Sequence, residues 1–217
     1  MSWHVASITL DNLDELPKRC RSCVFWELSD HLGKQAAEFA STDLEKEAWV
    51  SGVLLEWGSC GKIVHVRGVP AGYVMYAPPS AVPRASEMPT GPVSADAVLL
   101  TTMQVMPEFA GEGLGRMLAQ AVVKDLTRRG VKAIEVFGDA RPGTEPSCVI
   151  PAEFLRGVGF KTVRPHPRWP RLRMELRAAM TWKEDVEAAL EQILGSVTIP
   201  MQPAAPVRPQ VPARTSV

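Results

Sequence analysis

Residues 105–118 read Val-Met-Pro-Glu-Phe-Ala-Gly-Glu-Gly-Leu-Gly-Arg-Met-Leu and decide the fold of this chain. They join the end of an apolar strand to a glycine-rich turn and then to an amphipathic helix. Glycines at 111, 113 and 115 let the backbone take positive φ and approach an anion closely, while the first N–H groups of the helix point at it. The stretch therefore predicts a phosphate-binding turn.

The segments on either side of the turn complete a strand–helix–strand unit. Residues 97–105 are rich in Val, Leu and Thr and predict a central strand. After the glycines, Leu114 and Leu118 fall four apart on one helix face, and Gly130 is placed to end that helix. Residues 131–137 predict a second buried strand. Together the three elements predict a parallel strand pair with a right-handed crossover.

The other segments predict an α/β domain built around this unit. Helical patterns cover residues 14–32, with interruptions, then 34–57 and 152–157, whereas strand patterns cover 5–10, 63–66, 72–77, 160–164 and 172–176. Residues 78–92 contain five prolines and predict an exposed loop, since proline cannot donate to a regular ladder. Residues 138–151 predict a second irregular stretch. The domain is expected to span residues 1–180.

Two further segments are expected after this domain. Thr181 and Glu184 form a capping box before an apolar stripe, and Gly195 provides a stop, so residues 181–195 predict a separate amphipathic helix. Beyond it, a proline recurs at every third residue from 200 to 212, which is the period of polyproline II. We expect residues 196–217 to form a disordered tail, with a ligand for a protein partner as the alternative.

Composition and charge exclude several classes of function. Lys plus Arg and Asp plus Glu number 24 each, so no overall field favours nucleic acid or an acidic membrane surface. No apolar run approaches the roughly 20 residues that a membrane span needs, and the first residues do not resemble a signal peptide. Four cysteines in a chain of this length do not form a disulfide scaffold. We therefore expect a cytoplasmic protein without a nucleic-acid or membrane partner.

The glycine spacing excludes two common phosphate loops. A Walker loop needs Lys followed by Ser or Thr after its last glycine, but Arg116 and Met117 stand here. A dinucleotide-binding turn needs the spacing Gly-x-Gly-x-x-Gly, whereas these glycines recur at every second residue. A different class of phosphate-binding turn is required.

Met103-Gln104-Val105, Pro107, the glycines at 111, 113 and 115, and Leu118 resemble motif A of the GCN5-related N-acetyltransferase (GNAT) family. Further on, Pro151-Ala-Glu-Phe-Leu-Arg-Gly-Val-Gly159-Phe160 resembles the short helix of this family running into a Gly-Phe strand start. The resemblance covers about residues 5–177. It implies a mixed central sheet, splayed after strand 4 and flanked by helices. It also implies direct transfer of an acetyl group from acetyl-CoA to a primary amine.

The resemblance assigns cofactor-binding positions. Backbone groups of Met103 and Val105 are expected to contact the pantetheine arm, and a strand amide near Val105 to polarise the thioester carbonyl. The pyrophosphate is expected at the N–H groups of the turn, that is, at Gly111, Glu112, Gly113, Leu114, Gly115 and Arg116. The Arg116 side chain either adds charge at the phosphates or is simply an exposed helix residue. No metal site is expected.

Departures from the family pattern concern catalysis. Ala110 stands where the family often carries Arg or Gln, and Leu155 where many members have the tyrosine that protonates the leaving thiolate. Cys148 takes the place of an asparagine that often contacts the cofactor. Its thiol is therefore the candidate proton donor, with a buried structural cysteine as the alternative. These departures favour, as a second hypothesis, a non-catalytic module that binds acyl-CoA or a protein partner.

The acceptor side of the site is less well defined by the sequence. Asp96, His65 and Glu27 are candidate bases for the incoming amine, and none stands out. The spacing Cys20-x-x-Cys23 suits half a zinc site or a redox pair, with ordinary packing cysteines as the third possibility. Small amines, peptide N-termini and lysine side chains all remain open as acceptors.

Overall fold

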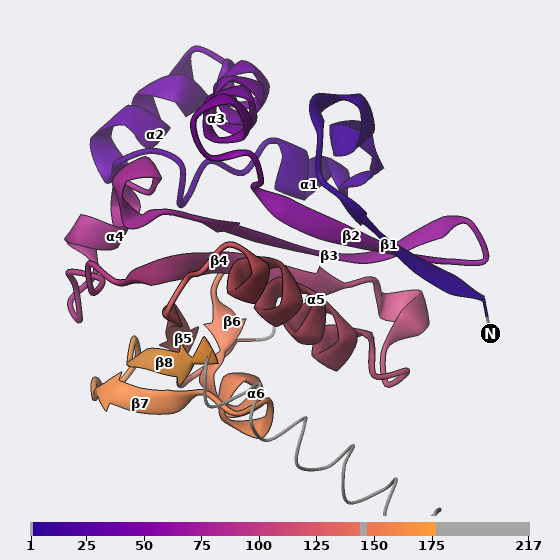
Figure 1. The fold of residues 1–217 in the computed structure, drawn as a ribbon. Helices are drawn as coiled ribbons and strands as arrows, with labels where there is room; N and C mark the ends of the chain where they lie inside the picture. Colours follow the sequence, from indigo (N-terminus) through magenta and orange to yellow (C-terminus); the bar gives the residue numbers. More distant parts are fainter. Residues whose placement is uncertain (1, 144–146, 177–217) are drawn as a thin grey trace, which may run out of the picture. The chain divides into compact units, whose positions relative to one another are not determined.

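A mixed eight-stranded sheet carries the fold in the computed structural model, which describes residues 2–143 and 147–176 (Figure 1). Its strands follow the order β1-β2-β3-β4-β5-β8-β7, and β6 pairs with β5 off this path. The strands are β1 (Trp3–Ser7), β2 (Gly61–Val66), β3 (Val69–Ala77), β4 (Ala97–Val105), β5 (Ala133–Asp139), β6 (Ile150–Pro151), β7 (Lys161–Arg164) and β8 (Arg171–Glu175). The pairs β4–β5 and β5–β6 are parallel, and the other pairs are antiparallel.

Helices cover both faces of the sheet (Figure 1). On one face lie α1 (Lys18–Arg21), α2 (Asp30–Glu38) and α3 (Thr42–Trp57), and on the other lie α5 (Leu114–Arg128) and α6 (Ala152–Gly157). The shorter elements are the 3-10 helices η1 (Leu10–Glu15), η2 (Pro79–Ala81) and η3 (Pro107–Phe109), and the helical turn α4 (Arg84–Glu87). No helix of the described ranges is both long and apolar enough to cross a membrane.

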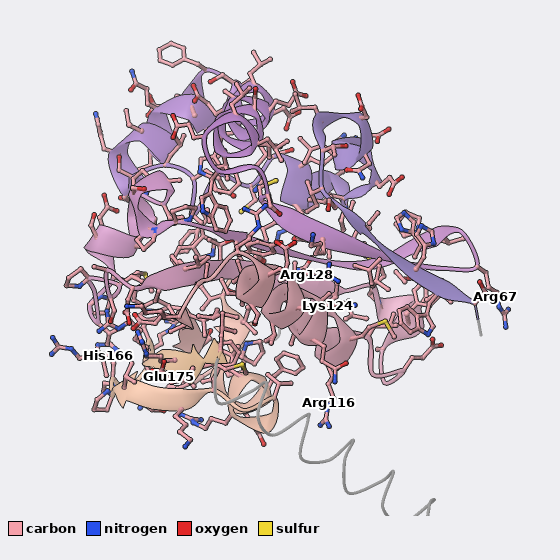
Figure 2. All side chains as sticks on the ribbon, viewed as in Figure 1. Arg67, Arg116, Lys124, Arg128, His166 and Glu175 are labelled. Carbon is pink, nitrogen blue, oxygen red and sulfur yellow. The ribbon has the colours of Figure 1, made fainter. Side chains whose placement is uncertain are left out.

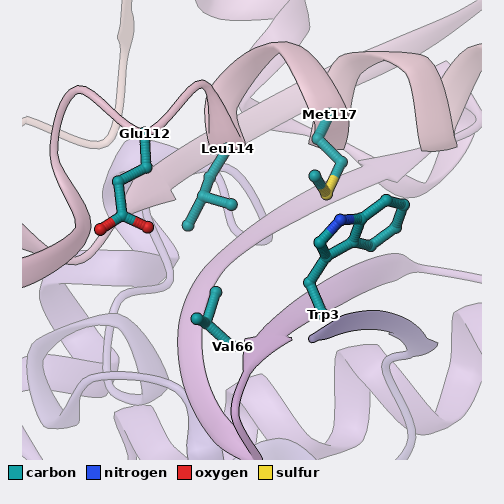
Figure 3. Close-up of a pocket in the computed structure, with 5 residues that line it drawn as sticks. All are labelled: Trp3, Val66, Glu112, Leu114 and Met117. Carbon is teal, nitrogen blue, oxygen red and sulfur yellow. The ribbon is translucent and has the colours of Figure 1, made fainter. Parts of the chain in front are cut away.

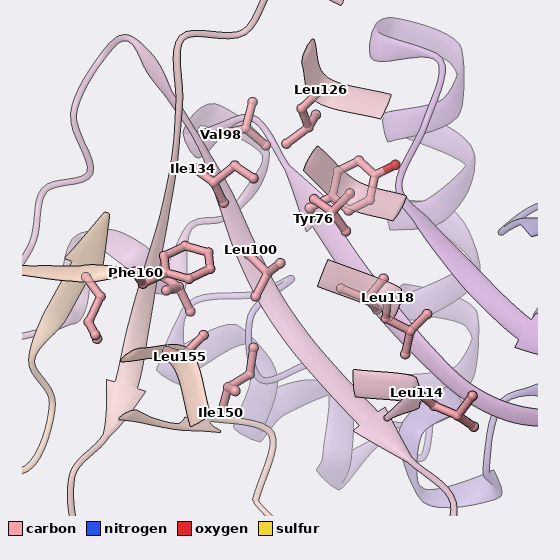
Figure 4. Packing of buried hydrophobic residues seen from close by; sticks show 14 of the residues in the cluster. Tyr76, Val98, Leu100, Leu114, Leu118, Leu126, Ile134, Ile150, Leu155 and Phe160 are labelled. Carbon is pink, nitrogen blue, oxygen red and sulfur yellow. The ribbon is translucent and has the colours of Figure 1, made fainter. Parts of the chain in front are cut away.

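β4 is buried on both faces because successive side chains point to opposite sides of the sheet. Val98 and Leu100 pack in the apolar cluster under α5, as Figure 4 shows. Leu99 packs in the second cluster, on the α1–α3 face, beside Phe137. The prediction of a central strand over residues 97–105 is confirmed with the same bounds.

The sheet divides between β4 and β5. β4 pairs with β3 as far as Val105, but its parallel pairing with β5 stops after the third residue pair, Leu99 with Glu135. Farther along, β5 pairs instead with the two residues of β6. The predicted fold class, a mixed central sheet splayed after strand 4 and flanked by helices, is therefore confirmed. We call the opening between β4 and β5 beyond Leu99 the fork.

Several boundaries in the N-terminal part differ from the sequence prediction: β2 and β3 begin two and three residues earlier than expected, and within residues 14–32 only α1 and the start of α2 are α-helical. The first strand covers Trp3–Ser7 rather than residues 5–10, because the chain turns into η1, where Thr9 N donates to Asn12 Oδ1 at 2.8 Å. The helix predicted over residues 34–57 is two helices. Ala40 has φ 50° between them, and Ser41 N closes the end of α2 on Ala36 O at 2.9 Å.

The proline-rich stretch 78–92 is not the exposed loop that its composition predicts. It contains η2 and α4, and Val82, Ala85 and Met88 are buried in the cluster on the α1–α3 face. Proline is compatible with the first turn of a helix, so the prolines start short helical turns here while the apolar residues between them pack inward. The helix predicted over 181–195 and the tail over 196–217 lie outside the described residues.

Two glycines provide a test of the packing. A Cβ atom at Gly61 in β2 would collide with Val74 O and lie 2.6 Å from Ile8 Cδ1, whereas a Cβ atom at Gly52 in α3 would meet nothing within 4 Å. We expect Gly61→Ala to destabilise the fold by about 1–3 kcal/mol and Gly52→Ala to stabilise it by about 0.5–1 kcal/mol through helix propensity. Urea unfolding followed by circular dichroism measures both, and equal effects would contradict the packing described.

Candidate functional site

The glycine turn before α5 leaves open space in front of the helix. Gly111 has φ 84° and Gly113 has φ 79°, values in the left-handed region that favours glycine. A Cβ atom built on either residue would meet no other part of the protein within 4 Å. A side chain at either of these two positions would therefore project into the open space in front of the helix.

Five backbone N–H groups of this turn, those of Gly111, Gly113 and residues 114–116, have no hydrogen-bond partner among the described residues. The first hydrogen bond at the start of α5 runs from Met117 N to Gly113 O at 3.2 Å, so the N–H groups of residues 114–116 lack a helical acceptor. No group in the described parts of the chain accepts a hydrogen bond from the N–H groups of residues 114–116, or from those of Gly111 and Gly113. Glu112 differs, since its N–H donates to Phe109 O at 3.4 Å. Unpaired N–H groups at the positive end of a 15-residue helix suit a phosphate.

Gly115 has a packing role that the sequence did not reveal. A Cβ atom there would lie 3.0 Å from Cε2 and Cζ of Phe154, which comes from α6. The Phe154 ring thus rests directly against the backbone of the first turn of α5. The third glycine of the motif allows this close contact between α5 and α6, whereas Gly111 and Gly113 face open space.

The edge of β4 toward the fork carries unpaired backbone groups. Met106 N donates to Ala71 O at 2.9 Å, so this residue pair on β4 and β3 is a hydrogen-bonded one. Antiparallel pairs alternate, and the register of Val105 with Gly72 and of Met103 with Val74 makes both of these non-hydrogen-bonded pairs. The N–H and C=O groups of Met103 and Val105 therefore point away from β3, toward the fork, where β5 no longer pairs with β4.

The side chains of the turn point to different surroundings. Glu112 lines a pocket of about 370 Å³ together with Trp3, Val66, Leu114 and Met117 (Figure 3). The exposed Arg116 side chain extends outward from the first turn of α5 (Figure 2). Ala110, also exposed, stands just before the turn.

On the opposite face of the sheet, three cysteines lie near the fork, but they do not form the pair that their spacing suggested. Cys20 Sγ is 3.0 Å from Oε1 of Gln104, the residue of β4 between Met103 and Val105. Cys23 Sγ instead lies 2.7 Å from Cys148 Sγ, which is 125 positions away in the sequence. Of the alternatives that the Cys20-x-x-Cys23 spacing left open, a single redox or metal-binding unit of these two cysteines is therefore not supported by their geometry.

The contact between the two sulfur atoms changes the acidity of both thiols. The Cys148 thiol donates a hydrogen bond that stabilises the Cys23 thiolate and lowers the pKa of Cys23 to about 7, against the opposing effect of burial. The N–H of Phe25 lowers this pKa further. The same hydrogen bond, together with burial, raises the pKa of Cys148, so Cys148 remains a thiol at neutral pH.

The segment that follows Cys23 is held firmly against the fork. Trp26 is 2% exposed, stacks on Phe137 of β5 with ring centroids 5.8 Å apart, and donates from Nε1 to Cys148 O at 3.4 Å. Glu27 forms a buried ion pair with Lys46 of α3, and Lys46 Nζ also donates to Cys23 O at 3.1 Å. Trp26 is thus a core residue, and the buried pair keeps Cys23 in place.

The other candidate acids and bases are already engaged. Asp96 accepts from Arg173 at 2.9 Å, Glu27 from Lys46, and His65 Nε2 lies 2.6 Å from Glu15 Oε2. The hydrogen bond from Arg173 lowers the pKa of Asp96. Leu155, in the position of the family's tyrosine, is fully buried in the cluster under α5. Asp96, Glu27 and His65 are therefore each paired with another side chain, and Leu155 offers no acidic or basic group.

Residues 2–143 and 147–176 contain no cluster of three or more His, Cys, Asp or Glu side chains able to hold a metal ion. Sequence reasoning found the turn and the edge of β4, but it missed the contact between Cys23 and Cys148 and that between Gly115 and Phe154. Both contacts join segments far apart in the sequence, so no local pattern indicates them.

Comparisons with known proteins agree with this architecture. The family model described as FR47-like protein, which is of the GNAT type, matches residues 83–150, a range that includes β4, the glycine turn, α5 and β5.

Three solved structures are similar in fold. The PaiA N-acetyltransferase of Thermoplasma acidophilum, solved with coenzyme A, is 12% identical to this chain with a TM-score of 0.54, and the alignment covers 81% of this chain and 99% of that protein. The putative acetyltransferase YncA of Salmonella typhimurium, solved with acetyl-CoA, is 15% identical with a TM-score of 0.54, covering 81% and 95%. A putative GNAT-family acetyltransferase of Desulfovibrio desulfuricans is 17% identical with a TM-score of 0.51, covering 81% and 99%. No curated protein sequence matches the chain.

The fork, the glycine turn and these matches together define the class: the protein has the fold of the GCN5-related N-acetyltransferases. The resemblance seen in the sequence is therefore confirmed at the level of the fold.

The acidity of Cys23 provides a test of the site geometry. Because its pKa is lowered to about 7, the rate of Cys23 alkylation by iodoacetamide should rise through a midpoint near pH 7, whereas an ordinary thiol has its midpoint near about 8.5. Cys148→Ala removes the donated hydrogen bond and should move the midpoint upward. Peptide mass spectrometry follows each site, and the buried Cys60, whose pKa burial raises to about 12, is the internal control. An ordinary midpoint in the unsubstituted protein would refute the described contact.

Proposed function

We propose that the protein is an acyl-CoA-dependent N-acetyltransferase that transfers an acetyl group from acetyl-CoA to a primary amine by direct attack in a ternary complex. One observation carries the proposal. The unpaired edge of β4 at Met103 and Val105 leads into the unpaired N–H groups of the glycine turn at the start of α5. A linear ligand with amide groups at one end and phosphates at the other suits this arrangement. The proposal includes the cytoplasmic location expected from the sequence.

The pyrophosphate of acetyl-CoA would be held by the turn. The N–H groups of Gly111, Gly113 and residues 114–116 are available, and the helix dipole favours negative charge there. The N–H of Glu112 already donates to Phe109 O, so Glu112 would give the phosphates no hydrogen bond and would instead link the two glycines whose N–H groups are available. The Arg116 side chain is exposed close to the N–H groups and adds positive charge.

The pantetheine arm would lie along the free edge of β4. Its amide groups can form strand-like hydrogen bonds with the backbone of Met103 and Val105, which orients the thioester at the fork. An N–H group near Val105 would then polarise the thioester carbonyl as the amine attacks. Positioning and polarisation account for the proposed rate enhancement.

Cys148 is the proposed proton donor for the leaving CoA thiolate. Its raised pKa keeps the thiol protonated at neutral pH, and it lies just before β6, which borders the fork on the β5 side. Leu155 has no proton to give. The step requires Cys23 to be a thiol: as Cys148 gives its proton to the CoA sulfur, Cys23 passes its own proton to Cys148. The negative charge then ends on Cys23, whose thiolate the Cys148 thiol stabilises, and solvent reprotonates Cys23.

A non-catalytic module that binds acyl-CoA is the second candidate, favoured by the buried, apolar Leu155. Calorimetry with acetyl-CoA and an assay of CoA thiol release, run over small amines, peptide N-termini and lysine peptides, distinguish the two candidates. Binding with turnover supports the enzyme. Binding without turnover on any acceptor supports the module, and the absence of binding overturns both.

The turn is tested by a matched pair of substitutions at the two ends of α5. Gly113 and Gly130 have φ 79° and 72°, and a Cβ atom meets nothing at either position. Alanine should therefore cost about 1 kcal/mol of stability at both sites. Only Gly113→Ala places a methyl group in the proposed phosphate space, and we expect its dissociation constant for acetyl-CoA to rise at least about tenfold, or about 1.4 kcal/mol. An equal affinity of both variants, measured by calorimetry, would refute the placement of the phosphates.

The role of Cys148 is tested by removing its thiol. If Cys148 donates the proton, Cys148→Ala should lower kcat by about 10²-fold with little change in KM, since loss of a general acid affects the chemical step. Cys60→Ala, a matched loss of a buried thiol remote from the proposed reaction, should retain kcat. Steady-state kinetics by CoA thiol release checks this, and an unchanged kcat in Cys148→Ala would assign Cys148 a structural role.

A further inference from the structure

We propose that Cys23 and Cys148 form a redox modification site, at which a hydroperoxide oxidant joins the two thiols in a reversible disulfide. The pairing itself goes beyond the proposed acyl transfer and does not depend on it. The pairing rests on the position, surroundings and exposure of the two thiols.

The geometry places the two sulfur atoms next to each other. Cys23 Sγ and Cys148 Sγ are 2.7 Å apart, so an approach of less than about 1 Å brings them to the S–S bond length. Cys23 lies between α1 and α2, and Cys148 lies just before β6. Neither residue belongs to a helix or strand, so the approach requires no break in regular structure.

The remaining two cysteines are excluded as partners. Cys20 and Cys60 are buried, whereas Cys23 and Cys148 are partly exposed and therefore accessible to a small oxidant. Cys20 Sγ is engaged with Gln104 Oε1, and burial raises the pKa of both Cys20 and Cys60. Because the thiolate is the reactive form, Cys23 is the cysteine that an oxidant attacks first.

The surroundings of Cys23 fix the pair in this orientation. Lys46 Nζ holds the carbonyl of Cys23, and the indole of Trp26 holds the carbonyl of Cys148. Lys46 is itself fixed by its buried ion pair with Glu27. Both backbone segments are thus held by donors from neighbouring elements, and the thiols remain opposite each other.

The reaction proceeds in two balanced steps. The Cys23 thiolate attacks one oxygen of hydrogen peroxide, the O–O bond breaks, and Cys23 becomes a sulfenic acid while hydroxide leaves. The sulfur of Cys148 then attacks the Cys23 sulfur, the S–O bond breaks, and the departing oxygen leaves as water with the Cys148 proton. Overall, the two thiols lose two electrons and two protons, and the peroxide is reduced to two molecules of water.

Thiol counting on the full-length protein tests the proposal. The reduced protein contains four thiols, and after peroxide treatment a titration in denaturant should find two, those of Cys20 and Cys60. The intact mass should fall by about 2 Da, a non-reducing peptide map should show Cys23 linked to Cys148, and dithiothreitol should restore all four thiols. Cys60→Ser is the matched control and should form the same link.

Two variants test the order of the steps. Cys148→Ser should stop at a Cys23 sulfenic acid that dimedone traps, and Cys23→Ser should leave Cys148 unmodified under the same treatment. Persistence of four thiols in the oxidised protein, a link between Cys20 and Cys23, or a link between two molecules would each overturn the proposal.

One consequence rests on the proposed function. If Cys148 is the proton donor, the disulfide removes its proton, so peroxide should lower the rate of acyl transfer at least about tenfold and dithiothreitol should restore it. Cys60→Ser should respond in the same way. A transfer rate that is unaffected by the disulfide would overturn this consequence. If the protein transfers no acyl group at all, the proposed function fails while the thiol counts still decide the redox site.

Discussion

The separation of β4 from β5 after three residue pairs is the constraint on which the rest of the structure depends. β4 keeps its pairing with β3 as far as Val105, so one edge of the strand is satisfied and the other is free. An unpaired buried N–H or C=O group costs about 1–3 kcal/mol unless water or a ligand pairs with it. The free edge at Met103 and Val105 therefore offers hydrogen-bonding groups to water or a ligand, and the turn at its end adds further donors.

The parts of the fold that follow from strong local patterns were predictable. β4 and α6 have the predicted bounds, and α5 begins at Leu114 and is followed by Gly130 with φ 72°. A run of Val, Leu and Thr marks β4, and flanking glycines with a four-residue apolar repeat mark α5. The break between α2 and α3 was missed. Its left-handed residue is Ala40 rather than glycine, and apolar residues continue across it, although Thr42 and Glu45 have the capping-box spacing that marks the start of a helix.

The candidate site divides in the same way. The half proposed to hold the phosphates lies on consecutive residues, 111–116, so the local sequence and its resemblance to motif A were enough to predict it. The other half of the site contains the contact between the Cys23 and Cys148 thiols and the stacking of Trp26 on Phe137. Both pairs are far apart in the sequence and meet only in the folded domain. The Cys-x-x-Cys spacing even pointed to the wrong partner, since α1 directs Cys20 toward Gln104 and leaves Cys23 in the following turn.

The contact between Gly115 and Phe154 connects these two halves mechanically. Phe154 belongs to α6, which begins at Ala152 directly after β6, only four residues beyond Cys148. Because the ring rests on bare backbone, the two helices meet here with no side chain of α5 between them. A larger residue at position 115 would therefore have to displace either Phe154 or the first turn of α5, that is, the turn on one side or the helix that follows Cys148 on the other.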